Sequence, residues 1–304
     1  MDYLQLHREL PLNLTTLVLA FDGWADAGRS ATRAIRYLKR RLEAQPLANI
    51  DPEEFFDFTR VRPTIRTDSE GARTIDWPTN QFNLWHKPNN STGLLMLQGA
   101  EPGLKWKIFA ELILDLANRC GTEKIVSLAA IQAAIPHTRT PRVTCSSTDS
   151  SMHEMLKEWG ILRKRRQSYQ GPAGISTVLR ELAIERGLPV TSFVTQVPHY
   201  IQTQSNPAAA LALLRYVCPF LNIEIDFSRL ERWAGEFDNR CNQAVNQSSE
   251  MQAYVQQLEN MYDDTFEALE SPVDEGPAIN SEGILQDLEE FLRNEREGGN
   301  DSTI

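Results

Sequence analysis

Charged and aromatic side chains that could perform acid–base chemistry recur in this chain directly after short apolar runs. Two carboxylates follow the run at residues 17–21, and a third follows the run at residues 94–97. Two histidines follow later runs of the same kind. Carboxylates and imidazoles that meet in one place can act as general acids and bases. An arginine beside glycine-flanked helix starts could also hold an anion.

Glycines accompany these side chains at the same strand ends. A glycine lets the backbone turn sharply and lets a ligand approach closely. In open α/β sheets, ligands sit outside the carboxyl ends of the strands. The sequence therefore predicts one candidate pocket, formed by Asp22, Gly23, Asp26, Gly28, Gly99, Glu101, His137, Arg139, Gly171, Gly174, His199 and Tyr200.

Each of these residues also has a purely structural interpretation. Asp22 and Asp26 can cap a helix or close a turn, as aspartate often does. His137 follows a proline and can simply orient its loop, and His199 can be a hydrogen-bonded histidine beneath a proline turn. The glycines can serve only to allow tight turns before helices.

Several motifs of known chemistry are absent from the sequence. It contains no GxxxxGK[ST] phosphate loop, no GxGxxG dinucleotide motif and no GxSxG nucleophile turn. It has no HExxH motif, and its four cysteines form no CxxC pair. We therefore predict no cofactor and no metal, no nucleophile stands out, and the sequence leaves open whether the protein is an enzyme.

The pattern of apolar residues predicts the elements that position these side chains. Buried strands are expected at 17–21, 94–97, 124–130 and 190–197, and helices at 31–42, 106–120, 176–186 and 206–220. Residues 46–52 are expected to form a loop, and residues 55–61 a further strand. Short strands near 74–77 and 81–85 suggest an antiparallel flap or sheet edge. The alternation of strand and helix indicates an α/β fold with a mostly parallel sheet flanked by helices.

The pattern changes after residue 226. Apolar residues then alternate at spacings of four and three from Leu230 to Tyr262, a heptad pattern that predicts helix. A capping-box pair within it, Ser249 and Gln252, favours a C-terminal helical hairpin over one long helix. An acidic, proline-containing linker and one short helix at 284–296 follow. We expect an α/β core domain at 1–227, the helical hairpin at 228–270, and an acidic linker, short helix and disordered tail at 271–304.

The composition excludes some partners. The 304 residues include 41% hydrophobic and 24% charged residues, with a formal net charge of -10. An acidic surface is unfavourable for binding nucleic acid or an anionic membrane. The basic run at residues 163–166 is interpreted as a solvated face. No signal peptide or membrane-length apolar run is evident, and the cysteines are dispersed, so a cytoplasmic location is expected.

Five short motifs in this order resemble the proteasome assembly chaperone two (PAC-two) family. They are GWADAG at 23–28, GAEPGLKW at 99–106, PHTR at 136–139, GPAGI at 171–175 and VPHY at 197–200. The resemblance covers roughly residues 14–225, and the tail is similar to the helical extension of the bacterial branch. Thr140 stands where the family usually has a proline.

The resemblance implies a core similar to the nucleoside phosphorylase/hydrolase fold and a homo-oligomer, for which a trimer is one form. It favours a non-enzymatic assembly, scaffold or binding protein, and the C-terminal helices are suited to a protein partner. The alternative from the residues themselves is a small-molecule, nucleoside-like hydrolase or phosphorylase that uses Asp26, Glu101, His137 and His199 at the strand ends.

Overall fold

The computed structural model describes residues 3–87, 93–161, 171–201 and 205–270. The chain forms two compact units, residues 1–260 and residues 261–304. In the second unit, residues 261–270 continue the last helix. The helix predicted at 284–296 and the predicted disordered end lie outside the described residues. The division of the chain at residues 227 and 270 stays a prediction.

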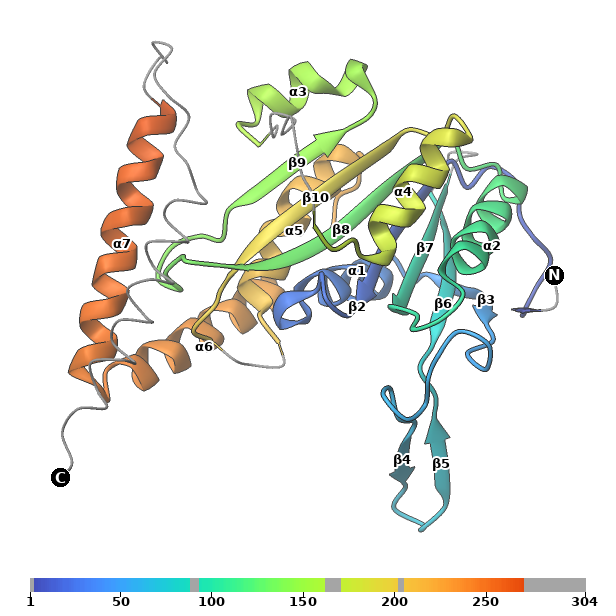
Figure 1. The fold of residues 1–304 in the computed structure, drawn as a ribbon, viewed down its shortest axis with the longest axis horizontal. Helices are drawn as coiled ribbons and strands as arrows, with labels where there is room; N and C mark the ends of the chain where they lie inside the picture. The colour runs from blue at the N-terminus through green and yellow to red at the C-terminus, as the bar shows by residue number, and fades with distance from the viewer. Residues whose placement is uncertain (1–2, 88–92, 162–170, 202–204, 271–304) are drawn as a thin grey trace. The chain divides into compact units, whose positions relative to one another are not determined.

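An eight-stranded sheet forms the centre of the first unit (Figure 1). In spatial order its strands are β1 (Leu4–Leu6), β3 (Gln45–Ile50), β6 (Asn80–His86), β7 (Gly93–Ala100), β2 (Thr16–Asp22), β8 (Lys124–Ala133), β10 (Val190–Pro198) and β9 (Val143–Ser147). The four strands β7, β2, β8 and β10 are parallel, and antiparallel strands extend the sheet on both sides. Since β3 also runs in their direction, the predicted mostly parallel sheet is confirmed.

Helices cover both faces of this sheet (Figure 1). The helices on one face are α1 (Ser30–Arg41), α5 (Pro207–Phe220) and α6 (Ser228–Val245), and those on the other are α2 (Trp106–Arg119) and α4 (Ile175–Glu185). Two further helices are α3 (His153–Glu158) and α7 (Ser249–Glu270). The predicted C-terminal helical pair is therefore present as α6 and α7.

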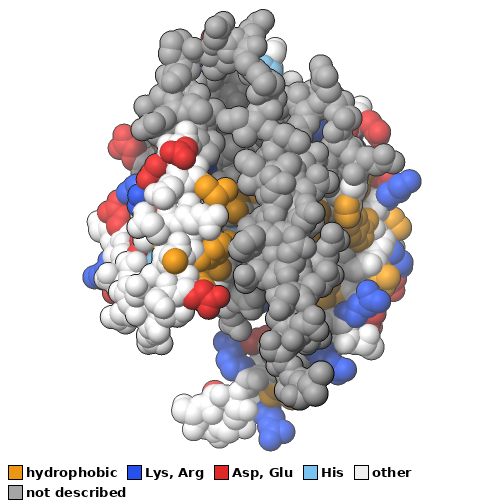
Figure 2. All heavy atoms as spheres, turned by 60° about the vertical axis from the view of Figure 1, so that its left-hand side comes forward, with side chains coloured by type: hydrophobic (Ala, Val, Ile, Leu, Met, Phe, Trp, Pro, Cys, Tyr) orange, Lys and Arg blue, Asp and Glu red, His pale blue; other side chains and the backbone are white. Residues whose placement is uncertain are grey.

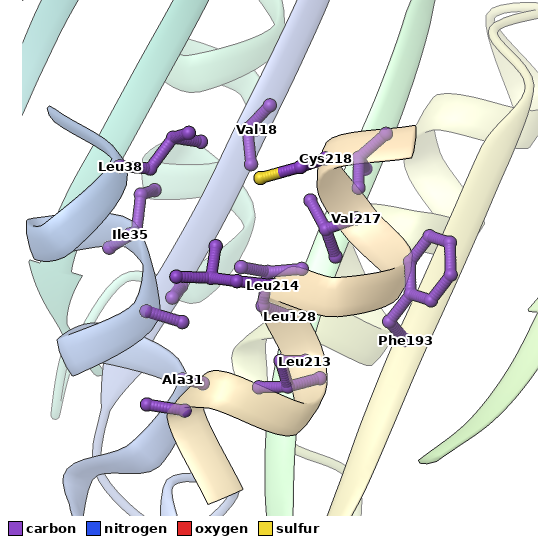
Figure 3. Packing of buried hydrophobic residues seen from close by; sticks show 14 of the residues in the cluster. Val18, Ala31, Ile35, Leu38, Leu128, Phe193, Leu213, Leu214, Val217 and Cys218 are labelled. Carbon is purple, nitrogen blue, oxygen red and sulfur yellow. The ribbon is translucent and has the colours of Figure 1, made fainter. Parts of the chain in front are cut away.

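The central strand β2 shows why the sequence is apolar without interruption there. Val18 and Ala20 belong to the buried cluster under α1 and α5, whereas Leu17 and Leu19 belong to the cluster under α2 and α4. Side chains of a strand alternate between the two faces, so a strand covered on both faces must be apolar throughout. Figure 3 shows the first cluster, where α5 directs Leu214 and its neighbours toward the sheet.

Two predictions near residue 50 are wrong. Residues 45–50 form strand β3 instead of a loop, and a register shift beside Pro46 lets the strand accommodate the missing N–H. Residues 55–61 form turns instead of a strand. Phe55 and Phe56 are buried because the backbone folds back at Pro52, whose carbonyl accepts bonds from both N–H groups. Asp57 then closes a turn by accepting a bond from Thr59 N at 2.9 Å.

A two-stranded hairpin, β4 (Thr64–Thr67) and β5 (Arg73–Asp76), projects from the sheet (Figure 1). Its turn is held by Asp68, whose carboxylate accepts bonds from Glu70 N and Ala72 N. Arg66 and Asp76 form an ion pair across the two strands. The short antiparallel strands expected in this region are confirmed.

The surface carries charges of both signs. On the face that Figure 2 presents, acidic and basic side chains of the described residues are interspersed, so the acidic excess is not gathered in one patch there. Within the described residues, no helix combines the length and the apolar character needed to cross a membrane.

Gly99 is required by the close approach of β6 and β7. A Cβ atom at Gly99 would lie 1.7 Å from Asn80 Oδ1, inside any permitted contact. We predict that Gly99→Ala lowers the free energy of unfolding by roughly 2 kcal/mol or more, because Asn80 and the strand must shift. Urea unfolding followed by circular dichroism measures this.

Gly103→Ala is the matched control for this substitution. A Cβ atom there would meet its nearest neighbour, Asp57 N, at an ordinary 3.7 Å. Equal stabilities for the two variants would contradict the steric account of Gly99.

Candidate functional site

The two aspartates after β2 occupy different environments. Asp22 stays near the surface, where its carboxylate pairs with Arg29 Nε at 3.3 Å. The chain then makes a single 3₁₀ turn, η1 (Ala27–Arg29), before α1 begins. Asp26 precedes this turn and is buried, with 5% of its surface exposed. Only Asp26 is therefore held inside the protein.

The carboxylate of Asp26 binds the start of α1. Its Oδ1 accepts a hydrogen bond from Ala31 N at 2.7 Å. Its Oδ2 accepts bonds from Thr32 N at 3.3 Å and from the Thr32 hydroxyl. These N–H groups lie in the first turn and have no partner within the helix. The interpretation of Asp26 as a helix cap is confirmed.

Burial alters the acidity of Asp26. Loss of hydration raises the pKa of this carboxyl from 3.8 to about 6, and the negative charge of Asp22 acts in the same direction. The hydrogen bonds from Thr32 and Ala31 oppose that rise without cancelling it. Asp26 is therefore a structural acid that titrates close to neutral pH.

Glu101, just after β7, joins two of the predicted loops. Its Oε1 accepts a bond from Ile175 N at 2.8 Å, at the start of α4, and its Oε2 accepts one from Trp24 N at 3.3 Å. Glycines make the space for it. A Cβ atom at Gly23 would lie 2.9 Å from Glu101 Cβ, and one at Gly174 would lie 3.2 Å from Oε1. The structure thus brings Gly23, Glu101 and Gly174 together.

The remaining predicted glycines have local roles. Gly28 adopts a positive φ of 58°, and its carbonyl accepts a bond at 2.7 Å from the backbone N–H of Asn206, the N-cap of α5. Gly99 accommodates Asn80, as described above. Gly171 lies in the segment that leads into α4.

His137 contacts Tyr200 and helix α6. Its Nδ1 lies 2.6 Å from the Tyr200 hydroxyl, and its Nε2 lies 3.0 Å from Asn242 Oδ1. The hydroxyl oxygen also accepts a bond from His137 N at 2.8 Å, so its own proton points to Nδ1. These bonds fit the tautomer protonated on Nε2. Burial raises the pKa of Tyr200 to about 12, which keeps that hydroxyl protonated.

His199 contacts the end of β8 and helix α7. Its Nδ1 donates to the Ala133 carbonyl at 3.1 Å, and its Nε2 accepts a bond from the Tyr254 hydroxyl at 3.0 Å. The rings of His199, Tyr200 and Tyr254 pack edge to face, with centroids 5.8 to 6.1 Å apart. Both nitrogens of His199 therefore have partners, which confirms the structural interpretation of this histidine.

Arg139 completes the contact with α7. Its Nη1 lies 3.4 Å from Glu259 Oε1, and the neighbouring Thr138 hydroxyl donates to the same oxygen. The Glu259 side chain is 17% exposed, so this pair is partly shielded from water. A shielded pair is screened less by salt than a surface pair.

We call these contacts the helix anchor. It consists of His137, Arg139, His199 and Tyr200 from the loops, with Asn242, Tyr254 and Glu259 from α6 and α7. Through their contacts, the polar residues predicted to share one pocket separate into three groups. Asp26 caps α1, Glu101 ties the β2 loop to α4, and the histidines hold the C-terminal helices.

Sequence analysis missed the partners on the helices. Asn242 and Tyr254 stand beside the heptad positions Cys241 and Val255, and that pattern predicts helices without indicating the surface on which they pack. Within the residues that the structure describes, no three His, Cys, Asp or Glu side chains gather in a way that could hold a metal ion.

The protein is an α/β domain with helices on both faces of its sheet. Its strand-end loops bind a pair of C-terminal helices through the helix anchor. Comparison with family models identifies the group. The model of the PAC2 family matches residues 20–245, and the chain belongs to this family.

Solved structures show the same relationship. A PAC2 family protein from Streptomyces avermitilis is 31% identical, covers 79% of this chain and 99% of its own, and has a TM-score of 0.69. The proteasome-assembly chaperone homologue Rv2125 of Mycobacterium tuberculosis is 29% identical, with 79% and 100% covered and a TM-score of 0.69.

A more distant structure shares the fold. PbaB, an archaeal proteasome activator from Pyrococcus furiosus, is 18% identical, covers 80% of this chain and 99% of its own, and has a TM-score of 0.65. No curated protein matches this sequence.

Asp26 gives the first unit a testable dependence on pH. The carboxyl has a higher pKa when folded, about 6, than its ordinary 3.8, so the folded state holds this proton more tightly. Stability from this group is full below about pH 4 and is lost as the pH rises through 6. The unfolding free energy of the protein minus that of Asp26→Asn should fall by roughly 2 kcal/mol between pH 4 and 7.

Urea unfolding of both proteins at pH 4, 5, 6 and 7 measures this difference. Asp115→Asn, which removes an exposed carboxylate paired with Arg186, is the control for losing one acidic charge. If the difference in unfolding free energy between the protein and Asp26→Asn stays constant or grows as the pH rises, the raised pKa of Asp26 is contradicted.

Proposed function

We propose that this protein is a non-enzymatic assembly or scaffold protein of the cytoplasm. In this proposal it acts as a homo-oligomer, with a trimer as the expected form, and binds protein partners through α6 and α7. The observation that carries the proposal is the helix anchor. The groups best suited to acid–base chemistry are engaged in holding these two helices.

The side-chain chemistry of the anchor supports a structural role. Both ring nitrogens of His137 and of His199 have hydrogen-bond partners within the protein. A general base needs a nitrogen within reach of a substrate proton. To act as a base, His137 would first have to give up its bond to Tyr200, and His199 its bond to Tyr254 of α7. No observation on the described residues favours the hydrolase or phosphorylase alternative.

The name of one relative supports a role in assembly. Rv2125, 29% identical to this chain, is described as a proteasome-assembly chaperone homologue. We extend that role to this chain as a proposal, with proteasome subunits as the first partners to test.

The helices offer a surface suited to a protein. An apolar groove of about 620 Å³ lies at the junction of α6 and α7, with Phe237, Cys241 and Met251 among its lining residues. Apolar concave surfaces of this kind accept apolar side chains of a partner. This groove supports binding through the helices.

The cysteines support the proposed compartment. All four are free thiols, and Cys120, Cys145 and Cys218 are buried. Burial raises the pKa of Cys145 to about 12, which keeps it as an unreactive thiol. Free thiols in a chain of this size fit the reducing cytoplasm.

Reconstitution with proteasome α subunits tests the proposal. The purified full chain is mixed with α subunits from the same organism, and native mass spectrometry follows complexes over time. We expect the chain to sediment as a homo-oligomer, to form a complex with the subunits and to raise the yield of assembled rings at least twofold.

A variant and a ligand screen sharpen this test. Met251→Glu puts a charge into the apolar groove and should abolish the increase in the yield of assembled rings. The control Ile65→Glu, on the exposed β4–β5 hairpin, should leave that increase unchanged. Absence of any complex, together with thermal stabilisation by nucleosides or phosphate that His137→Ala removes, would overturn the proposal and restore the enzyme alternative.

A further inference from the structure

A second groove lies between α1 and α6 and is lined by arginines. It has a volume of about 560 Å³, and its arginines are Arg33, Arg36, Arg40, Arg41, Arg229 and Arg240. We call it the arginine groove. This concentration of positive charge stands out in a chain whose formal net charge is -10.

Helix geometry places three of these arginines in one row. Arg33, Arg36 and Arg40 are separated by three and four residues, so they lie on the same side of α1. Like charges at these spacings repel each other and weaken the helix. The row is therefore unfavourable by itself and would be stabilised by a bound anion.

An aromatic side chain of α6 fixes the opposite wall. Trp233 lines the groove, and the guanidinium carbons of Arg229 and Arg33 lie 4.6 and 5.7 Å from its ring centroid. Cations over an aromatic ring are attracted to its face. These contacts orient two arginines while leaving their N–H groups available for an anion.

Acidic side chains of the described residues compensate little of this charge. Arg41 pairs with Asp226, and Glu236 is the one carboxylate among the lining residues. Arg33, Arg40 and Arg240 form no ion pair within the described parts of the chain.

The acidities of nearby groups agree with this excess of positive charge. Burial lowers the pKa of the Arg33 guanidinium, and the charges of Arg36 and Arg40 add to that. Burial together with the same two arginines lowers the pKa of Lys39 to about 8. The positive charges of Arg36 and Arg40 therefore disfavour further positive charge on the neighbouring side chains of α1.

We propose that the arginine groove binds an acidic segment of a partner protein. Arginine forks match carboxylates in a bidentate geometry. Alternate side chains of an extended peptide lie about 6.6 Å apart. The rise from Arg36 to Arg40 along α1 is about 6 Å, so carboxylates on alternate residues of the peptide match the spacing of these two arginines.

Continuity with the apolar groove supports a peptide over a small anion. Arg240 and Ser205 line both grooves, so the charged groove adjoins the apolar one. A segment with acidic residues followed by apolar ones would fill both, whereas a phosphate group would occupy the charged end alone. This inference rests on the proposed function and names the chemistry of its partner.

Binding of a fluorescein-labelled octaglutamate peptide to the full chain tests the inference by fluorescence anisotropy. We expect binding that weakens at least tenfold between 50 and 300 mM salt, and none for octaglutamine. The double variant Arg40→Glu with Arg240→Glu, both exposed and unpaired among the described residues, should weaken binding more than tenfold.

Matched controls separate the groove from overall charge. Arg60→Glu with Arg73→Glu makes the same change in net charge at exposed sites outside the groove and should alter binding less than twofold. Equal losses in both double variants, or no peptide binding at all, would overturn the inference. Binding of tripolyphosphate without binding of the peptide would also overturn it. If the chain still captures α subunits, any of these three results would overturn the inference and leave the proposed function standing.

Discussion

The hydrogen bonds from His137 and His199 to α6 and α7 determine what the strand-end loops of this protein do. Strands β8 and β10 stay paired beyond the point where β2 leaves β8. Helices α6 and α7 bond to the two histidines that follow these strands. A buried polar group is costly unless it is paired, so these bonds favour one position of the helical pair over others. The surfaces formed by α6, the apolar groove and the arginine groove, depend on that position.

Much of the fold follows from the sequence because its physical causes are local. The uninterrupted apolar run of β2 reflects helices on both faces, and helical periodicity predicts α1 and α2 correctly. The region near residue 50 could not be predicted in this way. Pro46 argues against a strand unless a bulge accommodates it, and two adjacent phenylalanines were assigned to a pleated strand although a turn buries them both.

The candidate site was predicted in its residues but not in its contacts. The loops do carry the polar side chains expected of them, because parallel strands end at one edge. Which partner each side chain meets depends on tertiary packing. Glu101 reaches Ile175 across 74 positions of sequence, and Tyr254 reaches His199 across 55. No local pattern in the sequence encodes a contact of that length. The sequence alone therefore could not decide between the structural and the catalytic interpretation of these residues.

The position of α7 depends most directly on the bond between Tyr254 and His199, and a double-mutant cycle measures the strength of this bond. The unfolding free energies of His199→Ala, Tyr254→Phe and the double variant are compared with that of the unaltered chain by urea denaturation. A hydrogen bond that fixes α7 predicts a coupling of about 1 kcal/mol. Strictly additive effects, with a coupling within error of zero, would show that the strand-end loops do not hold the helix and would contradict the account.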